Sequence, residues 1–174
     1  VGAKTVNADD PLLTTRLEAP VDGRTPRTPL RIVLSRGLSV DPERRLFDVS
    51  AGPVLVVAEN ASGPVAARLS ERGVEVVEAP VEGRAFVSSE LLSLLAARGL
   101  TSVLVEGGAT VHRSFVTTGL WDELLVFVAP KVAGGDAPGW VAGFGLDRMG
   151  DAPTFRLVSQ ARSGDDALLT RLEQ

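Results

Sequence analysis

Residues 103–119 have the sequence VLVEGGATVHRSFVTTG, in which a short apolar run is followed by a carboxylate, two glycines and an amphipathic segment. The apolar run at 103–105 predicts a buried β-strand, and residues 109–118 predict a helix that ends at Gly119. A strand that leads through a glycine turn into a helix is typical of α/β domains. This stretch therefore predicts an α/β fold.

The rest of the chain shows the same alternation of strand and helix patterns. Short β-branched runs predict strands at residues 31–34, 54–58, 74–77, 124–128, 155–158 and 167–172. Helical patterns predict helices at residues 64–72 and 88–98, and each ends at a glycine. We expect a three-layer α/β domain with a mixed, mostly parallel sheet, to which the last strands add an antiparallel edge. Residues 18–28 and 134–149 predict surface loops, the second beside a pocket.

Composition and charge exclude several classes of function. The 174 residues contain 18 Lys and Arg against 22 Asp and Glu, and this net charge of −4 argues against a nucleic-acid partner. The chain has no cysteine and one histidine, which excludes disulfides, a cysteine nucleophile and the usual zinc sites, so no metal is expected. The apolar runs are too short to span a membrane, and the first residues lack the pattern of a signal peptide. We expect a cytoplasmic protein with one domain over residues 1–174.

The double glycine carries the sharpest candidate site. Glu106 follows the predicted strand, and Gly107 and Gly108 then lead directly into the predicted helix. Free backbone N–H groups and the helix dipole favour an anion at such a turn, and glycine lets a phosphate approach the backbone. The alternative is a turn that needs glycine for packing alone. His112, one turn into the helix, is more typical of a surface or interface residue than of a general base.

Two further segments are ambiguous when taken alone. Residues 9–11 (DDP) are explained by an Asx-Pro turn without any function. Arg16 is either a bidentate phosphate ligand or a solvated surface charge. Ser35 and Arg36 end a predicted strand, where an arginine can meet the 2′-phosphate of a dinucleotide or simply form a surface turn.

Three segments taken together resemble one known family. VGAKTVNADDPLLTTR at 1–16, RIVLSRG at 31–37 and the stretch 103–135 resemble the C-terminal reductase domain of the bifunctional riboflavin-biosynthesis deaminase–reductase. The resemblance implies a dihydrofolate-reductase-like fold, a homodimer, and reduction of 5-amino-6-(5-phosphoribosylamino)uracil to the ribitylamino product with NADPH. It also places residues 1–6 at the end of the family's second strand. The domain is then expected to be incomplete at its N-terminus, lacking its first strands.

The resemblance also implies which residues bind, although it assigns no catalytic side chain. The residues implied to contact NADPH are Thr5, Asp9, Ser35, Arg36, Gly107, Gly108, Ala109, Thr110 and Val111. The residues implied to contact the phosphorylated pyrimidine are Leu13, Arg16 and Glu106. Arg16 would hold the 5-phosphate, and the Glu106 carboxylate would accept hydrogen bonds from the substrate.

Two other functions fit the same residues. The first is an NADPH reductase of the same fold that acts on another small substrate, because a fold does not determine a function. The second is a non-catalytic remnant that binds a nucleotide. Arg16 favours the phosphorylated substrate, because it has no obvious role without a phosphate. A remnant would have no physical need for Asp9, Glu106 and both glycines together.

Overall fold

The computed structural model describes residues 1–17, 23, 26–163 and 167–173. Within these residues the helices are α1 (Ala3–Asp9), α2 (Pro64–Glu71), α3 (Ser88–Ala96) and α4 (Ala109–Thr118). The strands are β1 (Arg31–Leu34), β2 (Val54–Ala58), β3 (Glu75–Glu78), β4 (Val81–Glu82), β5 (Ala85–Phe86), β6 (Glu123–Val128), β7 (Arg156–Ser163) and β8 (Ala167–Glu173). Short 3-10 helices cover Arg45–Phe47, Val49–Ala51 and Met149–Asp151. None of the described helices is long and apolar enough to cross a membrane.

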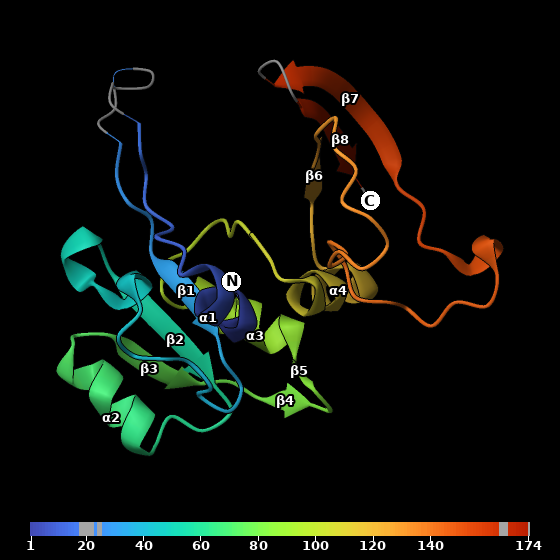
Figure 1. Cartoon of the computed structure of the whole chain (residues 1–174). Helices are drawn as coiled ribbons and strands as arrows, with labels where there is room; N and C mark the ends of the chain where they lie inside the picture. Colours follow the sequence, from blue (N-terminus) through green and yellow to red (C-terminus); the bar gives the residue numbers. More distant parts are fainter. Residues whose placement is uncertain (18–22, 24–25, 164–166, 174) are drawn as a thin grey trace.

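A parallel sheet in the order β1-β2-β3 carries the hydrophobic core, in the part of the molecule at lower left in Figure 1. All five residues of β2 are buried, as the unbroken apolar run of a central parallel strand predicts. On one face, Val56 belongs to the same cluster as Val6 of α1 and Leu69 of α2. On the other face, Leu55 belongs to a cluster with Leu91 of α3 and Phe115 of α4. The predicted three-layer α/β arrangement is confirmed.

The C-terminal strands pair antiparallel, as expected, but they do not form an edge of the parallel sheet. They form a separate sheet in the order β6-β8-β7, with Phe127 opposite Leu169 and Leu169 opposite Ala161. Figure 1 shows this sheet standing apart from the parallel one. At its base, the rings of Trp121 and Phe155 meet edge to face with their centres 5.2 Å apart. The prediction of one mixed sheet is therefore wrong for the described residues.

Residues 103–105 do not form the predicted strand, although their sequence, VLV, is apolar and β-branched. Val103 is 39% exposed and Leu104 is 75% exposed. Both line an apolar groove of about 170 Å³ whose other wall includes Leu30 and Ile32 of the β1 region. A strand forms only when a neighbour pairs with its backbone groups. No described segment lies along residues 103–105 in that way, so apolar sequence alone does not make this segment a strand.

Of residues 1–6, which the resemblance places at the end of a strand, only Val1 and Gly2 pair with β1. Val1 N donates to Ile32 O at 2.9 Å, and Leu34 N donates to Val1 O at 2.8 Å, so Val1 and Gly2 run parallel to β1. The chain then turns into α1, which neither the residue pattern nor the resemblance predicted. Val6, which is fully buried, holds this short helix on the sheet.

The strand predicted at 155–158 is longer, because β7 runs over Arg156–Ser163 and pairs along its length with β8. The remaining differences are smaller and follow from local geometry. Helices α2 and α3 end at Glu71 and Ala96, one or two residues before the predicted ends, because the chain tightens into a turn before the terminating glycine. The hairpin of β4 and β5 was not predicted. Residues 134–148 form the predicted loop without a helix or strand. Most of the predicted loop at 18–28 lies outside the described residues.

Candidate functional site

The glycine turn joins the extended segment to the N-terminus of α4. Gly107 is buried with a φ of +122°, and Gly108 is the N-cap residue with a φ of −60°. The peptide bond between them is cis. Gly108 has no side chain with which to cap the helix, and its carbonyl already accepts from Val111 N at 2.9 Å, so the N–H groups of Ala109 and Thr110 are the ones left for a ligand. Their positive potential favours an anion at this point.

Helix α1 lies directly against this turn. Gly2 N donates to Gly107 O at 3.1 Å. A Cβ atom added to Gly108 would lie 3.0 Å from Thr5 Oγ1, and one added to Gly2 would lie 3.2 Å from Val111 Cγ2. The structure therefore brings together Thr5, Gly107, Gly108 and Val111, which the resemblance implies as cofactor residues. It also explains why glycine stands at position 108, where a side chain would press on Thr5.

The end of β1 lies on the other side of Val1 and Gly2. Leu34 N bonds to Val1 O on one side, and Gly2 N bonds to Gly107 O on the other. Ser35, the next residue, is 1% exposed, and its Oγ has no hydrogen-bond partner among the described residues. A buried hydroxyl without a partner is unfavourable unless a ligand or water supplies one. Ser35 and the glycine turn therefore flank the same short segment, as the prediction of a common site requires.

Arg36 follows Ser35 and borders a second cavity. Its Nη1 donates to Gly83 O in the β4–β5 hairpin at 3.0 Å. The cavity has a volume of about 350 Å³, and Glu59, Asn60 and Ser62 also line it. It lies at the carboxyl ends of β1 and β2, where open α/β sheets place their ligands. Sequence reasoning missed these three residues, although their position between the end of a strand and the proline at the start of α2 was a usable signal.

Two of the three predicted substrate residues share one cavity. Leu13 and Glu106 both line the groove of about 170 Å³, together with Val1 and Val111. Glu106 is the one carboxylate among the lining residues in the described part of the chain. Arg16 is exposed and is not part of that lining. The structure thus joins Leu13 to Glu106 but leaves Arg16, three residues further along the chain, outside the lining of this groove.

The other predicted cofactor residues lie on the two helices of the site. Asp9 is exposed one turn after Thr5 on α1, so the two occupy the same helix face. Ala109 and Thr110 form the first turn of α4, and Thr110 is exposed. Ala109 O accepts a hydrogen bond from Ala142 N at 2.9 Å. The glycine-rich loop therefore reaches the helix N-terminus at which the anion is expected.

His112 holds the same loop in place. Its Nδ1 lies 2.7 Å from Trp140 O, and its Nε2 lies 3.2 Å from Val105 O. The imidazole therefore links the loop at 134–148 to the segment before the glycine turn. This contact was not predicted, because nothing local in the sequence connects His112 to a residue 28 positions away.

Replacing Gly107 with Ala is expected to lower the free energy of unfolding by about 1–3 kcal/mol, because a φ of +122° is strained for any residue with a side chain. The space itself is not the cause, since the new Cβ would lie 3.7 Å from His112 Cε1, an ordinary contact. Urea unfolding measures the change. Gly143→Ala is the control, because no atom lies within 4 Å of its Cβ and its φ is not strained. Equal stability of the two variants would contradict the argument.

These features together define a class of protein. Parallel strand ends, a glycine turn without a side-chain cap and a buried hydroxyl without a partner meet at one edge of a three-layer fold. This is the arrangement of α/β domains that bind their ligand at the carboxyl ends of parallel strands. The chain belongs to the RibD C-terminal domain family, whose sequence model matches residues 1–169.

Relatives and solved structures agree with this assignment. The chain is 36% identical to the riboflavin biosynthesis protein RibD of Bacillus amyloliquefaciens, over 99% of this chain and 45% of that protein. It is 36% identical to the 2,5-diamino-6-ribosylamino-4(3H)-pyrimidinone 5′-phosphate reductase of Methanothermobacter thermautotrophicus, over 97% and 76% respectively. A structure of Acinetobacter baumannii RibD matches with a TM-score of 0.80 and 26% identity, covering 99% of this chain and 45% of that one. The chain thus spans about half the length of RibD relatives.

Proposed function

We propose that this chain catalyses the NADPH-dependent reduction of 5-amino-6-(5-phosphoribosylamino)uracil to the ribitylamino product in riboflavin biosynthesis. The family assignment and the names of the relatives support this proposal. One structural observation carries it: Ser35 and the glycine turn flank Val1–Gly2, while Leu13 and Glu106 line the adjoining groove. A cofactor region and a substrate region therefore adjoin each other, as hydride transfer between two bound molecules requires.

NADPH supplies the hydride that reduces the ribose carbon, and the protein's part is to bind and orient the two molecules. The residues fit a dinucleotide, because Ser35 Oγ has no hydrogen-bond partner in the described part of the chain and no side chain caps the N-terminus of α4. The α4 N-terminus with Gly107, Gly108, Ala109, Thr110 and Val111 would hold the pyrophosphate. Thr5 and Asp9 would bind from α1.

Arg36 and the cavity of about 350 Å³ would take the adenosine end with its 2′-phosphate. A guanidinium suits a phosphate, because it donates two parallel hydrogen bonds. On the substrate side, Leu13 would pack against the pyrimidine, the Glu106 carboxylate would accept its hydrogen bonds, and Arg16 would bind the 5-phosphate. No proton donor is assigned.

A calorimetric titration of this chain tests the cofactor site. We expect NADPH to bind roughly 10-fold or more tightly than NADH, which corresponds to at least about 1.4 kcal/mol from the 2′-phosphate. Arg36→Ala should remove most of this preference without weakening NADH. Arg84→Ala is the matched control, because it removes the same charge from an exposed position in the neighbouring hairpin. Equal affinity of the unmodified chain for NADPH and NADH would contradict the proposal.

A second substrate is supported by a specific observation. The Methanothermobacter relative, of which the chain covers 76%, is named for a substrate that carries an amino group where the uracil has its 2-oxygen. Glu106 suits this alternative as well, because a carboxylate accepts hydrogen bonds from an amino group. Comparing kcat/KM for the two compounds decides between them. A preference above roughly 10-fold for the diamino compound would reassign the substrate while keeping the reductase.

The homodimer and the cytoplasmic location stay predictions. Exposed apolar side chains on one face of β6 support a homodimer, since Leu125 and Phe127 are 43% and 60% exposed. Contiguous exposed apolar surface of this kind commonly marks an interface.

A further inference from the structure

Asp10 ends α1 in a conformation that needs support from outside the helix. Its backbone is left-handed, with φ 43° and ψ 53°, and its N–H donates to Val6 O at 3.0 Å. Leu13, three residues further on, also has a positive φ, of 50°. Asp adopts this conformation more readily than most residues, but it is unfavourable for Leu. The path of the chain from Asp10 to Leu13 therefore depends on contacts that hold it.

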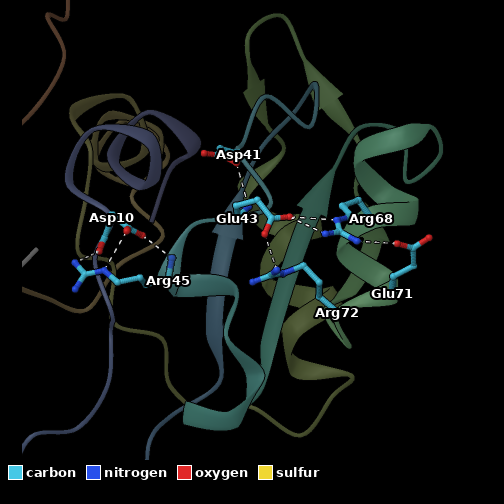
Figure 2. Close-up of polar contacts among 7 residues, drawn as sticks. All are labelled: Asp10, Asp41, Glu43, Arg45, Arg68, Glu71 and Arg72. Carbon is cyan, nitrogen blue, oxygen red and sulfur yellow. Dashed lines mark hydrogen bonds and ion pairs between the residues drawn. The ribbon is translucent and has the colours of Figure 1, made fainter.

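Arg45 supplies the main contact, and it holds Asp10 at three points (Figure 2). Arg45 N donates to Asp10 Oδ1 at 2.8 Å, and Arg45 Nε donates to Oδ2 at 3.1 Å. Arg45 Nη2 donates to the main-chain oxygen of Asp10 at 3.2 Å. Because one arginine binds both the carboxylate and the carbonyl, it sets the orientation of the peptide group that leads into Pro11.

Further contacts secure the rest of the loop at 10–16. The carbonyl of Leu12 accepts a weaker hydrogen bond, at 3.4 Å, from the buried guanidinium of Arg31. Thr15 Oγ1 donates to Arg27 O at 2.7 Å. Leu13, which lies between these points, lines the groove of about 170 Å³. The loop that carries the predicted substrate residues is thus held on both sides of Leu13.

Arg45 stands on a rigid support but outside the binding regions. It begins the 3-10 helix Arg45–Phe47, whose Leu46 and Phe47 are fully buried. Its own side chain is 66% exposed, against 21% for Asp10, and it lines neither cavity described above. An exposed ion pair adds little to overall stability. What this contact controls is the direction of the loop.

We propose that Arg45 is a positioning residue for the phosphorylated substrate. Through Asp10 it sets the path of the loop at 10–16, and so places Leu13 in the groove and determines where the exposed Arg16 lies. This role rests on the proposed function of the chain. Arg45 does not touch the substrate, so its removal affects binding only through the residues of the loop.

The test compares Arg45→Ala with Arg68→Ala in this chain. Arg68 is the matched control, because it is a similarly exposed arginine with carboxylate partners, Glu43 and Glu71, and does not contact the loop (Figure 2). We expect Arg45→Ala to raise KM for 5-amino-6-(5-phosphoribosylamino)uracil about 5- to 20-fold. The kcat, the Kd for NADPH and the melting temperature should match those of Arg68→Ala. Asp10→Asn should raise KM in the same direction.

A double substitution distinguishes an effect of Arg45 on the position of the loop from an unspecific loss of substrate binding. On an Arg16→Ala background, Arg45→Ala should raise KM by a smaller factor than it does alone, because part of its effect acts through Arg16 and only the part through Leu13 remains. Full multiplication of the two effects would overturn the proposal, as would a KM for Arg45→Ala equal to that of Arg68→Ala. If either of these two results is obtained and the unmodified chain still reduces the substrate, the proposed function stands while this inference fails. If the unmodified chain neither binds nor reduces it, the proposed function fails first.

Discussion

Replacing Arg31 with Met is expected to lower the free energy of unfolding by about 3–5 kcal/mol, because it leaves one buried and two partly buried carbonyls without their donor. Arg31 is 1% exposed at the start of β1. Its guanidinium donates to Leu46 O and Asp48 O at 2.8 Å each and to Gly52 O at 2.5 Å. Burial lowers the pKa of this guanidinium, and the nearby charge of Asp48 raises it in part.

The physical reason is that the Arg31 guanidinium supplies the hydrogen bonds that backbone N–H groups would supply in regular secondary structure. The chain from 44 to 52 forms only short 3-10 turns, so its carbonyls depend on a side-chain donor. Met has a similar length and fills the space, but it donates no hydrogen bond. The loss is therefore one of hydrogen bonding and not of packing. Arg31→Lys, with one ammonium group, should recover part of the stability.

Urea unfolding of both variants measures the effect, with Arg84→Met as the control. Arg84 is exposed on the β4–β5 hairpin, so the same exchange of side chains there should change stability by less than about 0.5 kcal/mol. A loss below about 1 kcal/mol for Arg31→Met would show that water or a rearranged chain satisfies the carbonyls instead.

Replacing Arg16 with Ala is expected to raise KM for the phosphorylated pyrimidine roughly 30- to 150-fold, which corresponds to about 2–3 kcal/mol for a charge-assisted contact to a phosphate. The Kd for NADPH should not change, because Arg16 lies on the loop at 10–16 and not at the glycine turn. Steady-state kinetics and calorimetry measure the two quantities. Arg27→Ala is the control, because it removes an exposed charge from the segment that pairs with Thr15.

The substrate without its phosphate makes this experiment decisive. Arg16 should matter little for that compound, so the difference between the variant and the unmodified chain should shrink to less than about threefold. An unchanged KM for the phosphorylated substrate in Arg16→Ala would argue for a reductase of some other small molecule. Equal effects on both compounds would assign Arg16 to the structure of the loop and not to the phosphate.

Elements with strong local signals were predicted closely. The strands β1 and β2 and the helix α4 have the predicted bounds. Val54–Ala58 is a continuous β-branched run, and Ala109–Thr118 lies between glycines that start and stop it. Elements without such signals were missed. Helix α1 contains Thr, Val, Asn and Asp, which have low helix propensity, and it depends on the burial of Val6.

The candidate site likewise has features that the local sequence predicts and features that only the fold creates. The double glycine predicted a turn with an exposed helix N-terminus, because this follows from a few adjacent residues. The contacts of Arg45 with Asp10 and of His112 with Trp140 join residues 35 and 28 positions apart, and no local pattern indicates them. The residues that line a cavity were likewise found only in the folded chain, as Asn60 and Ser62 show.

The amino-acid sequence by itself determined the α/β class, the parallel core and the glycine turn, because these depend on periodicity and on the backbone freedom of single residues. The tertiary structure decided which segments pair. Residues 103–105 are as apolar as β1, yet they form no strand, because a strand needs hydrogen-bonding neighbours that sequence does not specify. For the same reason the C-terminal strands form their own sheet. The preferences of single residues can be found in the sequence, whereas the pairing of strands far apart in the chain depends on the whole fold.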